Sequence, residues 1–595
     1  MMALKRKEIM DGTQNEEKHV RIPVKALPIL HDVPVYDDLR ELLDGSAEKY
    51  GDKDAFIIKT KRETKNSAAE YRHVSFNVLR QEIDWLGAAF MDAGLKGKRL
   101  AIIGKNRYEW ALGYYAQAFG LGIVVPLDRG LPYDELEWSL TKAKADVLLF
   151  DKDQLGLVRD LQAKPEFADL GFICMDREEG FTSLPELLDR GKELPAEYIR
   201  EYKELPIDKD AMAFIVFTSG TSNNAKAVML SHYNITFDIW ATVAPEDLRS
   251  TDVNMALLPY HHTFGCTSLS MMLYTGMTTV YCDGLKYLQK NLAEYKVSFF
   301  VGVPLILESM YKKIMNEIEK QGKMKTFNRG VKISRFLLKF GIDIRRKLFG
   351  EILESLGGGI RYLISGASPL HADVASGFID LGVKIIQGYG MTESSPVLSV
   401  ESPEHPCPGT IGYAVPGIEL MIEDPDEEGV GELIAKGPNV MLGYYENEEA
   451  TREVMEDGWL HTGDLACLDS KGNIVIRGRK KDVIVLKNGE NIYPEELEDL
   501  INDLPYVQEC MVYGEKKKKG EGDISLAVRI VYDAAKMKES RGAETPEEME
   551  EAVRADIDAI NSTMPAFKQI KRRYLTDVPM EKTTTGKIKR YKQKI

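Results

Sequence analysis

Residues 218–226, TSGTSNNAK, combine small hydroxyl side chains, one glycine and a lysine between two apolar runs. The runs at 214–217 and 227–230 predict buried strands. Small residues let backbone N–H groups approach an anion closely, hydroxyls add donors, and Lys226 adds a positive charge, so the stretch suits a polyphosphate. The spacing is not that of a Walker loop. A plain Ser/Thr turn between two strands explains this stretch equally well when it is considered alone.

Two further apolar runs end in small or polar residues. The first is RYLISGAS at 361–368, and the second is VKIIQGYGMTE at 383–393. In the second, glycines permit close backbone approach and Tyr389 offers a flat face for a base. Thr392 and Glu393 supply a hydroxyl and a carboxylate, which suit phosphate and Mg²⁺. The alternative is two ordinary strand-to-helix turns of an α/β sheet.

Histidines and an isolated aspartate mark two other segments. Residues 255–264, MALLPYHHTF, present His261 and His262 side by side. Adjacent side chains point to different faces, so hydrogen-bonded loop histidines are favoured over two ligands of one metal. In WLHTGDL, at 459–465, Asp464 stands in an otherwise uncharged predicted turn. Its carboxylate could accept from ribose hydroxyls, or it could cap the turn.

The elements that must position these residues alternate between strands and helices. The pattern predicts helices from residue 37 and over 76–94, a strand at 99–104 and short strands at 124–127 and 147–150. Asn106 is a candidate cap for the helix that follows the strand. Such alternation predicts an α/β fold with largely parallel sheets. Residues 1–34 are expected to form a polar arm.

Composition limits the classes of function. The chain has 595 residues and a net charge of -15, which argues against nucleic-acid binding. Its six cysteines lack a CxxC pair, so neither a zinc site nor a disulfide framework is indicated, and reduced intracellular thiols are expected. The first 20 residues do not resemble a signal peptide. Residues 254–282 lack charge but contain proline and histidine, which favours buried core over a membrane span. A cytoplasmic location is expected.

Residues 311–350 differ from the rest of this acidic protein. They contain twelve Lys/Arg against three Asp/Glu, and Ile333, Phe336, Leu337 and Phe340 recur at helical spacing. A basic amphipathic helix can lie on an anionic membrane. The alternative, which is commoner for such segments, is a solvated helix face beside an acidic neighbour.

Taken together and in order, these motifs resemble those of the adenylate-forming superfamily, which includes acyl-CoA synthetases and luciferases. TSGTSNNAK, LPYHHTFG, QGYGMTESSP, GELIAKGPNVMLGYY, WLHTGDL, GRKKD and TTTGKIKR all match family motifs. The resemblance covers about residues 35–595 and is greatest to long-chain fatty acyl-CoA synthetases. It implies a large AMP-binding α/β domain of layered subdomains at 35–478 and a small mobile α+β domain at 479–595.

The resemblance also implies a two-step reaction. A fatty acid attacks ATP to give an acyl-adenylate, and coenzyme A then displaces AMP, with Mg²⁺ as the metal. The residues implied for the β- and γ-phosphates are Thr218, Ser219, Gly220, Thr221, Ser222 and Lys226. Those implied for the adenine pocket are Gly366, Ala367, Ser368, Gly388, Tyr389 and Gly390. The remaining implied roles are Thr392 on phosphate, Glu393 on Mg²⁺, Asp464 and Arg479 on ribose, Lys587 between carboxylate and α-phosphate, His262 at the acyl pocket mouth, and Lys481 at the hinge between domains.

The phosphate loop departs from the usual family sequence TSGTTGNPKG. Asn223, Ala225 and Ala227 replace glycine, proline and glycine. Gly478 also stands where many members have aspartate. Two alternatives to a medium- to long-chain fatty acyl-CoA ligase remain open. One is a ligase that loads acyl carrier protein. The other, suggested by the altered loop, is a nucleotide-binding protein without turnover.

Overall fold

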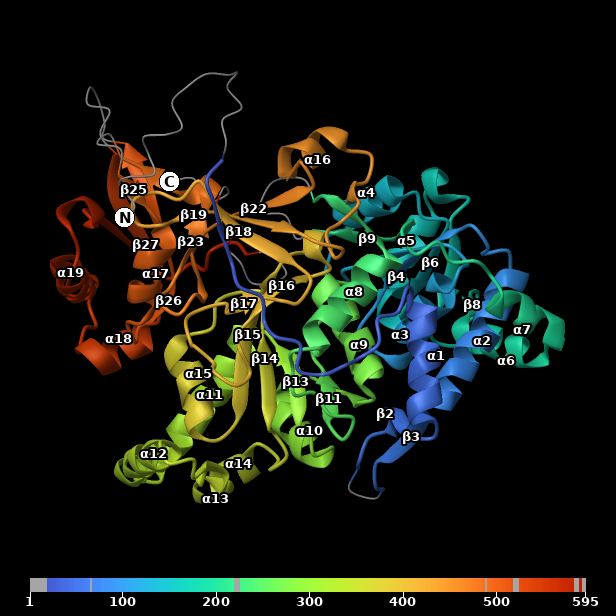
Figure 1. Ribbon diagram of the computed structural model, residues 1–595, viewed down its shortest axis with the longest axis horizontal. Coiled ribbons are helices and arrows are strands. Elements are labelled where there is room, and N and C mark those ends of the chain that lie inside the picture. Colours follow the sequence, from blue (N-terminus) through green and yellow to red (C-terminus); the bar gives the residue numbers. More distant parts are fainter. Residues whose placement is uncertain are drawn as a thin grey trace.

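The structure is a computed structural model that describes residues 19–64, 67–218, 225–486, 490–516, 524–582 and 588–590. Figure 1 shows a large domain of layered sheets and helices, with a smaller domain built from the last part of the chain. This is the α/β architecture that the sequence predicts, with a small α+β domain after it.

The first large sheet has the strand order β20-β10-β9-β5-β4-β6-β7-β8. Neighbours are parallel from β9 to β8, and β9 and β10 form an antiparallel hairpin. The predicted strands at 99–104, 124–127, 147–150, 214–217 and 227–230 all lie here. The bounds are β4 (Arg99–Ile103), β5 (Ile123–Leu127), β6 (Val147–Phe150), β7 (Gly171–Cys174), β8 (Thr182–Ser183), β9 (Met212–Phe217), β10 (Ala227–Ser231) and β20 (Gly443–Tyr444).

The second large sheet has the order β17-β16-β15-β14-β13-β11-β12-β2-β3. Its central strands, from β15 to β2, are parallel, which places the carboxyl ends of β11, β13, β14 and β15 at one edge. The bounds are β2 (Asp54–Lys61), β3 (Glu70–Ser75), β11 (Val253–Ala256), β12 (Thr278–Tyr281), β13 (Phe299–Gly302), β14 (Tyr362–Ser365), β15 (Lys384–Gly390), β16 (Val397–Val400) and β17 (Tyr413–Ala414).

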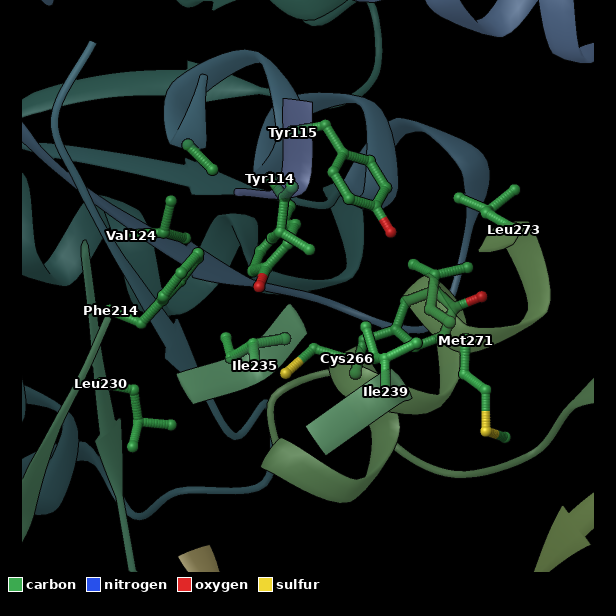
Figure 2. Close-up of a cluster of buried hydrophobic side chains, with 14 of the residues drawn as sticks. Tyr114, Tyr115, Val124, Phe214, Leu230, Ile235, Ile239, Cys266, Met271 and Leu273 are labelled. Carbon is green, nitrogen blue, oxygen red and sulfur yellow. The ribbon is translucent and has the colours of Figure 1, made fainter. Parts of the chain in front are cut away.

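Helices α8 and α9 pack between these two sheets. Helix α8 contacts β9, β10 and β16, whereas α9 contacts β12. Figure 2 shows the core here, where Phe214 and Leu230 of the first sheet meet Ile235 and Ile239 of α8 and Cys266 of α9. Almost every residue of both helices is buried, and the burial of α9 explains why residues 254–282 contain no Asp, Glu, Lys or Arg. Within the described helices, none combines the length and apolarity that crossing a bilayer requires.

Local side-chain chemistry sets where several helices begin. Asp38 accepts from the backbone N–H groups of Arg40 and Glu41 at the start of α1, and Ser231 and Asn234 form a capping box at α8. The helices of the large domain are α1 (Leu39–Tyr50), α2 (Phe76–Asp92), α3 (Tyr108–Ala118), α4 (Tyr133–Ala143), α5 (Leu155–Gln162), α6 (Leu184–Glu193), α7 (Ala196–Lys203), α8 (His232–Val243), α9 (Thr263–Thr275), α10 (Leu288–Glu294), α11 (Pro304–Lys320), α12 (Met324–Leu338), α13 (Arg345–Leu348), α14 (Gly350–Ser355), α15 (Ala372–Asp380) and α16 (Glu448–Val454).

The expected cap at Asn106 is wrong. Arg107 is the N-cap residue of α3, and the Asn106 amide instead donates to the carbonyl of Leu258 at 2.6 Å. Its side-chain oxygen accepts from the backbone N–H of Tyr260 at 3.0 Å. Asn106 therefore joins the first sheet to the segment that carries the paired histidines.

A third, antiparallel sheet has the order β1-β18-β19-β22-β21, with β23 beside β22. The predicted turn around Asp464 is wrong, because Asp464 lies within β22, where pairing with β19 and β23 extends the backbone. Part of the expected N-terminal arm adds to this sheet as β1. The bounds are β1 (Arg21–Pro23), β18 (Glu419–Glu423), β19 (Gly431–Lys436), β21 (Met455–Glu456), β22 (Trp459–Leu468) and β23 (Ile474–Arg479).

The small domain has its own apolar core, which includes Leu497, Val528 and Val553. It meets the large domain where Tyr493 packs with Val430 and Cys467, and where His371 pairs with Asp503 at 3.2 Å. The bounds are β24 (Ile484–Val485), β25 (Asn491–Ile492), α17 (Pro494–Asn502), β26 (Val507–Lys516), β27 (Ile524–Tyr532), α18 (Ala534–Arg541), α19 (Pro546–Ser562) and β28 (Arg572–Thr576). The short 3-10 helices are η2 (Lys152–Gln154), η3 (Pro165–Phe167), η4 (Leu285–Tyr287), η5 (Thr392–Ser394), η6 (Lys480–Asp482) and η7 (Ala566–Lys568).

Candidate functional site

The β9–β10 hairpin holds the two ends of the predicted phosphate loop. The backbone N–H of Thr218 donates to the carbonyl of Lys226 at 2.9 Å, and the N–H of Lys226 donates to Thr218 Oγ1 at 3.1 Å. These bonds close the loop at its base. Four predicted phosphate ligands, Ser219, Gly220, Thr221 and Ser222, lie outside the described residues.

Tyr444 connects the lysine of this hairpin to the predicted metal ligand. Lys226 Nζ lies 4.5 Å from the centroid of the Tyr444 ring, and the Tyr444 hydroxyl donates to Glu393 Oε1 at 2.7 Å. Burial, followed by the Glu393 charge, raises the pKa of Tyr444, so the phenol keeps the proton that it donates. Sequence reasoning gave Tyr444 no role, although it lies in the matching motif GELIAKGPNVMLGYY.

Glu393 follows the carboxyl end of β15, in the short helix η5. The residue is 7% exposed, and its backbone carbonyl accepts from the N–H of Met441 at 2.9 Å. Tyr444 occupies one carboxylate oxygen, whereas Oε2 meets no protein donor among the described residues. A buried carboxylate held by one oxygen and open at the other fits a Mg²⁺ ligand. Thr392 precedes it in the same turn.

Tyr389, Asp464 and Arg479 form a second group. The Tyr389 hydroxyl donates to Asp464 Oδ2 at 2.6 Å, and Arg479 Nε lies 2.7 Å from Asp464 Oδ1. Asp464 and Arg479 are directly paired in the β22–β23 register. Burial alone would lower the pKa of Arg479, but the combined attraction of nearby acidic groups, with Asp464 the largest contributor, outweighs burial and raises the pKa. The Glu393 charge acts in the same direction on Arg479, so the two groups are electrostatic neighbours.

The two predicted adenine-pocket turns lie side by side. Strands β14 and β15 are parallel with Ser365 opposite Gln387, so both turns leave the same edge of the sheet. A Cβ atom on Gly366 would lie 3.6 Å from the Gly388 carbonyl and 2.7 Å from the Phe264 ring. At Gly390 it would lie 1.8 Å from the carbonyl of Pro396, so both glycines are required for packing.

Ala367 and Ser368 form the exposed part of the first turn. Ala367 has a φ angle of 73°, in the left-handed region that a non-glycine residue seldom occupies. Such strain, of roughly 1–3 kcal/mol, is typical of functional turns. The exposed backbone of this turn is therefore held in a defined shape beside Gly388.

His262 is the N-cap residue of α9 and lies against His261, with ring centroids 4.2 Å apart. His261 Nε2 is 3.5 Å from Asp128 Oδ2. Burial lowers the pKa of His262 to about 4, so the imidazole is neutral at physiological pH. The two rings lie close together, which differs from the expectation that adjacent side chains point to different faces.

A small cavity of about 20 Å³ lies beside this histidine segment. Its lining includes Met255 of β11, Leu258 in the segment after β11, Leu269 of α9 and Val301 of β13, together with the polar residues Asn254 and Ser268. The small residues after His262 have packing roles. A Cβ on Gly265 would lie 1.9 Å from the Pro259 carbonyl, and Cys266 is only 2% exposed in the core of Figure 2.

The predicted hinge residue, Lys481, follows β23 in η6. Burial lowers the pKa of Lys481, and its charged neighbours include Asp482, Arg479 and Lys226. The adjacent Lys480 Nζ binds Glu432 Oε2 at 2.7 Å. Lys481 therefore lies close to Arg479 and Asp464 of the candidate site. Lys587, the residue implied for the α-phosphate, lies outside the described residues.

Comparison with known proteins agrees with this arrangement. The family described as AMP-binding enzyme matches residues 43–445, and the AMP-binding enzyme C-terminal domain matches residues 481–594. Fatty acyl-CoA synthetase B of Dictyostelium discoideum is 27% identical, over 83% of this chain and 77% of that protein. Peroxisomal long chain acyl-CoA synthetase 6 of Arabidopsis thaliana is 26% identical, over 85% of this chain and 75% of the matched protein.

A solved structure shares the fold. O-succinylbenzoate coenzyme A synthetase from Bacillus subtilis, in complex with AMP, superimposes with a TM-score of 0.70 and 22% identity, over 93% of this chain and 98% of that one. The match confirms the predicted fold of a large and a small domain. The family match covers well over half of the chain, and the relatives carry the names that the motifs predicted. The chain therefore belongs to the AMP-binding family of adenylate-forming enzymes, and resembles its long-chain fatty acyl-CoA synthetases.

Proposed function

We propose that this AMP-forming acid–thiol ligase activates a medium- to long-chain fatty acid as an acyl-adenylate and transfers the acyl group to coenzyme A. The observation that carries the proposal is that elements of three sheets bring two groups together: Lys226, Tyr444 and Glu393 beside Asp464 and Arg479. The first group suits a polyphosphate with its metal, and the second suits a ribose. The names of the matched relatives support the fatty acid.

In the first step, a carboxylate oxygen of the acid bonds to the α-phosphorus of ATP, and the bond from that phosphorus to pyrophosphate breaks. Two anions must approach, so fixed positive charge and hydrogen-bond donors are needed where charge develops. Lys226 and Thr218, with residues 219–222, hold the β- and γ-phosphates, and Lys587 bridges the carboxylate and the α-phosphate. When bound at Glu393, Mg²⁺ supplies charge neutralisation on the phosphate oxygens.

The remaining residues orient the nucleotide and the acid. Asp464 accepts from ribose hydroxyls while Arg479 and Tyr389 fix its carboxylate, which has lone pairs to spare. The Tyr389 ring stacks on adenine beside Gly366, Ala367, Ser368, Gly388 and Gly390, and Thr392 contacts phosphate. Neutral His262 stands at the mouth of the acyl pocket. In the second step, the sulfur of coenzyme A bonds to the acyl carbon and AMP leaves.

The proposal includes the division of the chain at residues 478 and 479. The large domain, 35–478, binds ATP and the acid, and the small domain, 479–595, turns about Lys481 between the two steps. Separate apolar cores on the two sides of this boundary support it.

A panel of carboxylic acids, from short to long chain, tests the proposal by pyrophosphate release. We expect Mg²⁺-dependent release that is greatest with medium- or long-chain acids, and thioester formation when coenzyme A is added. Asp464→Ala should suppress both. If a thioester forms only with acyl carrier protein, that protein and not coenzyme A is the acyl acceptor. Binding of nucleotide without pyrophosphate release for any acid would indicate that the protein does not turn over, and that the altered loop, with Ala225 and Ala227, is the reason.

A further inference from the structure

The outward face of α12 exposes large apolar side chains. Ile333, Phe336 and Phe340 are 48%, 59% and 67% exposed, and Ile342 is 51% exposed. The Phe336 and Phe340 rings lie together, with centroids 5.2 Å apart. The inward face is already apolar, because Phe327 and Gly330 pack against the second core. Packing within the chain therefore leaves the outward apolar residues unexplained.

Basic side chains surround these apolar residues. Arg329, Lys332 and Lys339 fall on the same face as Ile333 and Phe336 at helical spacing. Like the exposed Lys325 and Lys347 nearby, they form no ion pair with any of the described residues. Arg335 differs, because its Nε and Nη2 donate to the two carboxylate oxygens of Asp380. The predicted acidic neighbour thus accounts for Arg335 but not for the other cations.

The position of α12 limits what could bind there. Helix α11 starts at the carboxyl end of β13, and its 17 residues carry the chain about 25 Å away from the site before α12 begins. Figure 1 shows α12, α13 and α14 together at the end of the molecule opposite to β22. A carrier protein seated on α12 would lie a whole helix length from the reacting groups, whereas a flat anionic surface needs no access to them.

We propose that this face of α12 and the turn after it docks the enzyme on an anionic lipid bilayer. The α12 surface comprises Arg329, Lys332, Ile333, Phe336, Lys339, Phe340 and Ile342. Its unpaired cations attract anionic headgroups, and its aromatic and aliphatic side chains enter the headgroup boundary. The charge complementarity is specific to this segment, because the whole chain is acidic. The surface acts as a tether and takes no part in the chemistry.

Co-sedimentation of the full chain with vesicles tests the proposal. Binding is expected with vesicles that contain phosphatidylglycerol and not with pure phosphatidylcholine. It should weaken steeply as salt rises, because the screening length falls from about 10 Å at 0.1 M to about 3 Å at 1 M. The triple variant Arg329→Gln, Lys332→Gln and Lys339→Gln should bind at least tenfold more weakly. The pair Phe336→Ser and Phe340→Ser should do the same at low salt.

Matched controls separate this surface from net charge and general hydrophobicity. Lys49→Gln, Lys471→Gln and Lys571→Gln remove the same charge from distant exposed positions, and Leu285→Ser with Val578→Ser removes comparable exposed apolar area. Both controls should bind like the wild type. All five proteins should release pyrophosphate equally with a water-soluble short acid, which also shows that they are folded.

Three outcomes would overturn the proposal. The first is equal sedimentation of the charge variant and its control. The second is binding of neutral and anionic vesicles alike. The third is a dimer in the wild type that Phe336→Ser abolishes, which would assign the surface to a second copy of the chain. Failure of pyrophosphate release in all proteins would count against the proposed function. The vesicle experiment would still test the membrane proposal, because it does not depend on activity.

Discussion

Tyr444 contacts both of the charged side chains that are proposed to act on the phosphates of ATP, Lys226 and Glu393. Its ring lies under the Lys226 ammonium and its hydroxyl holds one oxygen of Glu393. It therefore orients a cation and a carboxylate that must act on the same polyphosphate. Since neither partner is near it in sequence, the tyrosine can be recognised only when the strands β10 and β20 are seen to pair.

The first prediction concerns this hydroxyl. Tyr444→Phe keeps the ring under Lys226 but removes the donor to Glu393. We expect a loss of about tenfold to a hundredfold in kcat/KM for pyrophosphate release, because a hydrogen bond to a charged group contributes about 1.5–3 kcal/mol. The Mg²⁺ concentration needed for half-maximal rate should rise. Tyr445→Phe is the matched control, since its hydroxyl accepts instead from Arg99 at 2.9 Å. Equal effects of the two changes would remove Tyr444 from the site.

At the residue scale, residue type and spacing predict part of the site and not the rest. Local chemistry indicated Glu393 and Asp464 as candidate site residues, whereas only the family resemblance indicated Arg479. Asn106 was mistaken for a cap because its true partners, around residues 258–260, are more than 150 positions away. Long-range partners of this kind leave no trace in local spacing.

At the scale of elements, the end of β23 meets helix α17 across the domain boundary. Gly478 has a φ angle of 150°, and a Cβ atom on it would lie 2.5 Å from Glu495 Oε2. Gly478 stands where many family members have aspartate, and the Glu495 carboxylate occupies the space that a side chain at position 478 would need. Glycine here lets α17 pack closely against the strand that leads into the hinge.

The second prediction tests this fit. Gly478→Ala should destabilise the protein by about 1–3 kcal/mol, from the collision and from the backbone angle. Adding Glu495→Ala to the Gly478→Ala variant should restore the part of the lost stability that comes from the collision. The effects of the two substitutions on the free energy of unfolding will therefore be strongly non-additive in a double-mutant cycle. Thermal unfolding of the four proteins measures this. Strict additivity would show that the two residues do not meet.

The third prediction uses the protonation of Glu495. Burial raises the pKa of Glu495 to about 7. The positive charge of Arg590 lowers this pKa, whereas the negative charges of Glu498 and Asp482 raise it. The folded state then binds more protons than the unfolded state between about pH 4.5 and 7, so stability falls as pH rises through that window.

Glu495→Gln should remove this dependence, because the amide resembles the protonated acid. Relative to wild type, the variant should therefore gain about 1 kcal/mol in stability on going from pH 5 to pH 8, after allowance for solvent screening. The midpoint of thermal unfolding at the two pH values measures the difference. A constant difference between the proteins would mean that Glu495 titrates normally.

Strands and helices were predicted best where they are buried. The apolar runs that became β9, β14 and β15 could be predicted because parallel strands covered on both faces need them, and β10 could be predicted because it is buried beside β9. The strand β22 was missed because WLHTGDL mixes small and polar residues, and only its pairing with β19 and β23 extends it. The same pairing, not the motif, brings Arg479 opposite Asp464.

At the scale of the whole molecule, the two reaction steps are expected to need different placements of the small domain. The fourth prediction is that Lys587→Ala lowers adenylation by about 10²–10³, because it removes a cation between two anions. Thioester formation from pre-made acyl-adenylate should be largely spared. Pyrophosphate exchange and thioester formation, measured separately, test this. An equal loss in both half-reactions would contradict the role implied for Lys587.

The strand β1 has a consequence for how the chain is made. Residues 21–23 pair with residues 421–423, and Arg21 reaches Glu423 across 402 positions of sequence. On a ribosome that adds about 5–20 residues per second, the first strand waits about 20–80 s before its partner is synthesised. During that time Leu27, which is buried in the finished fold, must stay exposed or covered by a chaperone. Closure of the large domain is therefore among the last events of its synthesis.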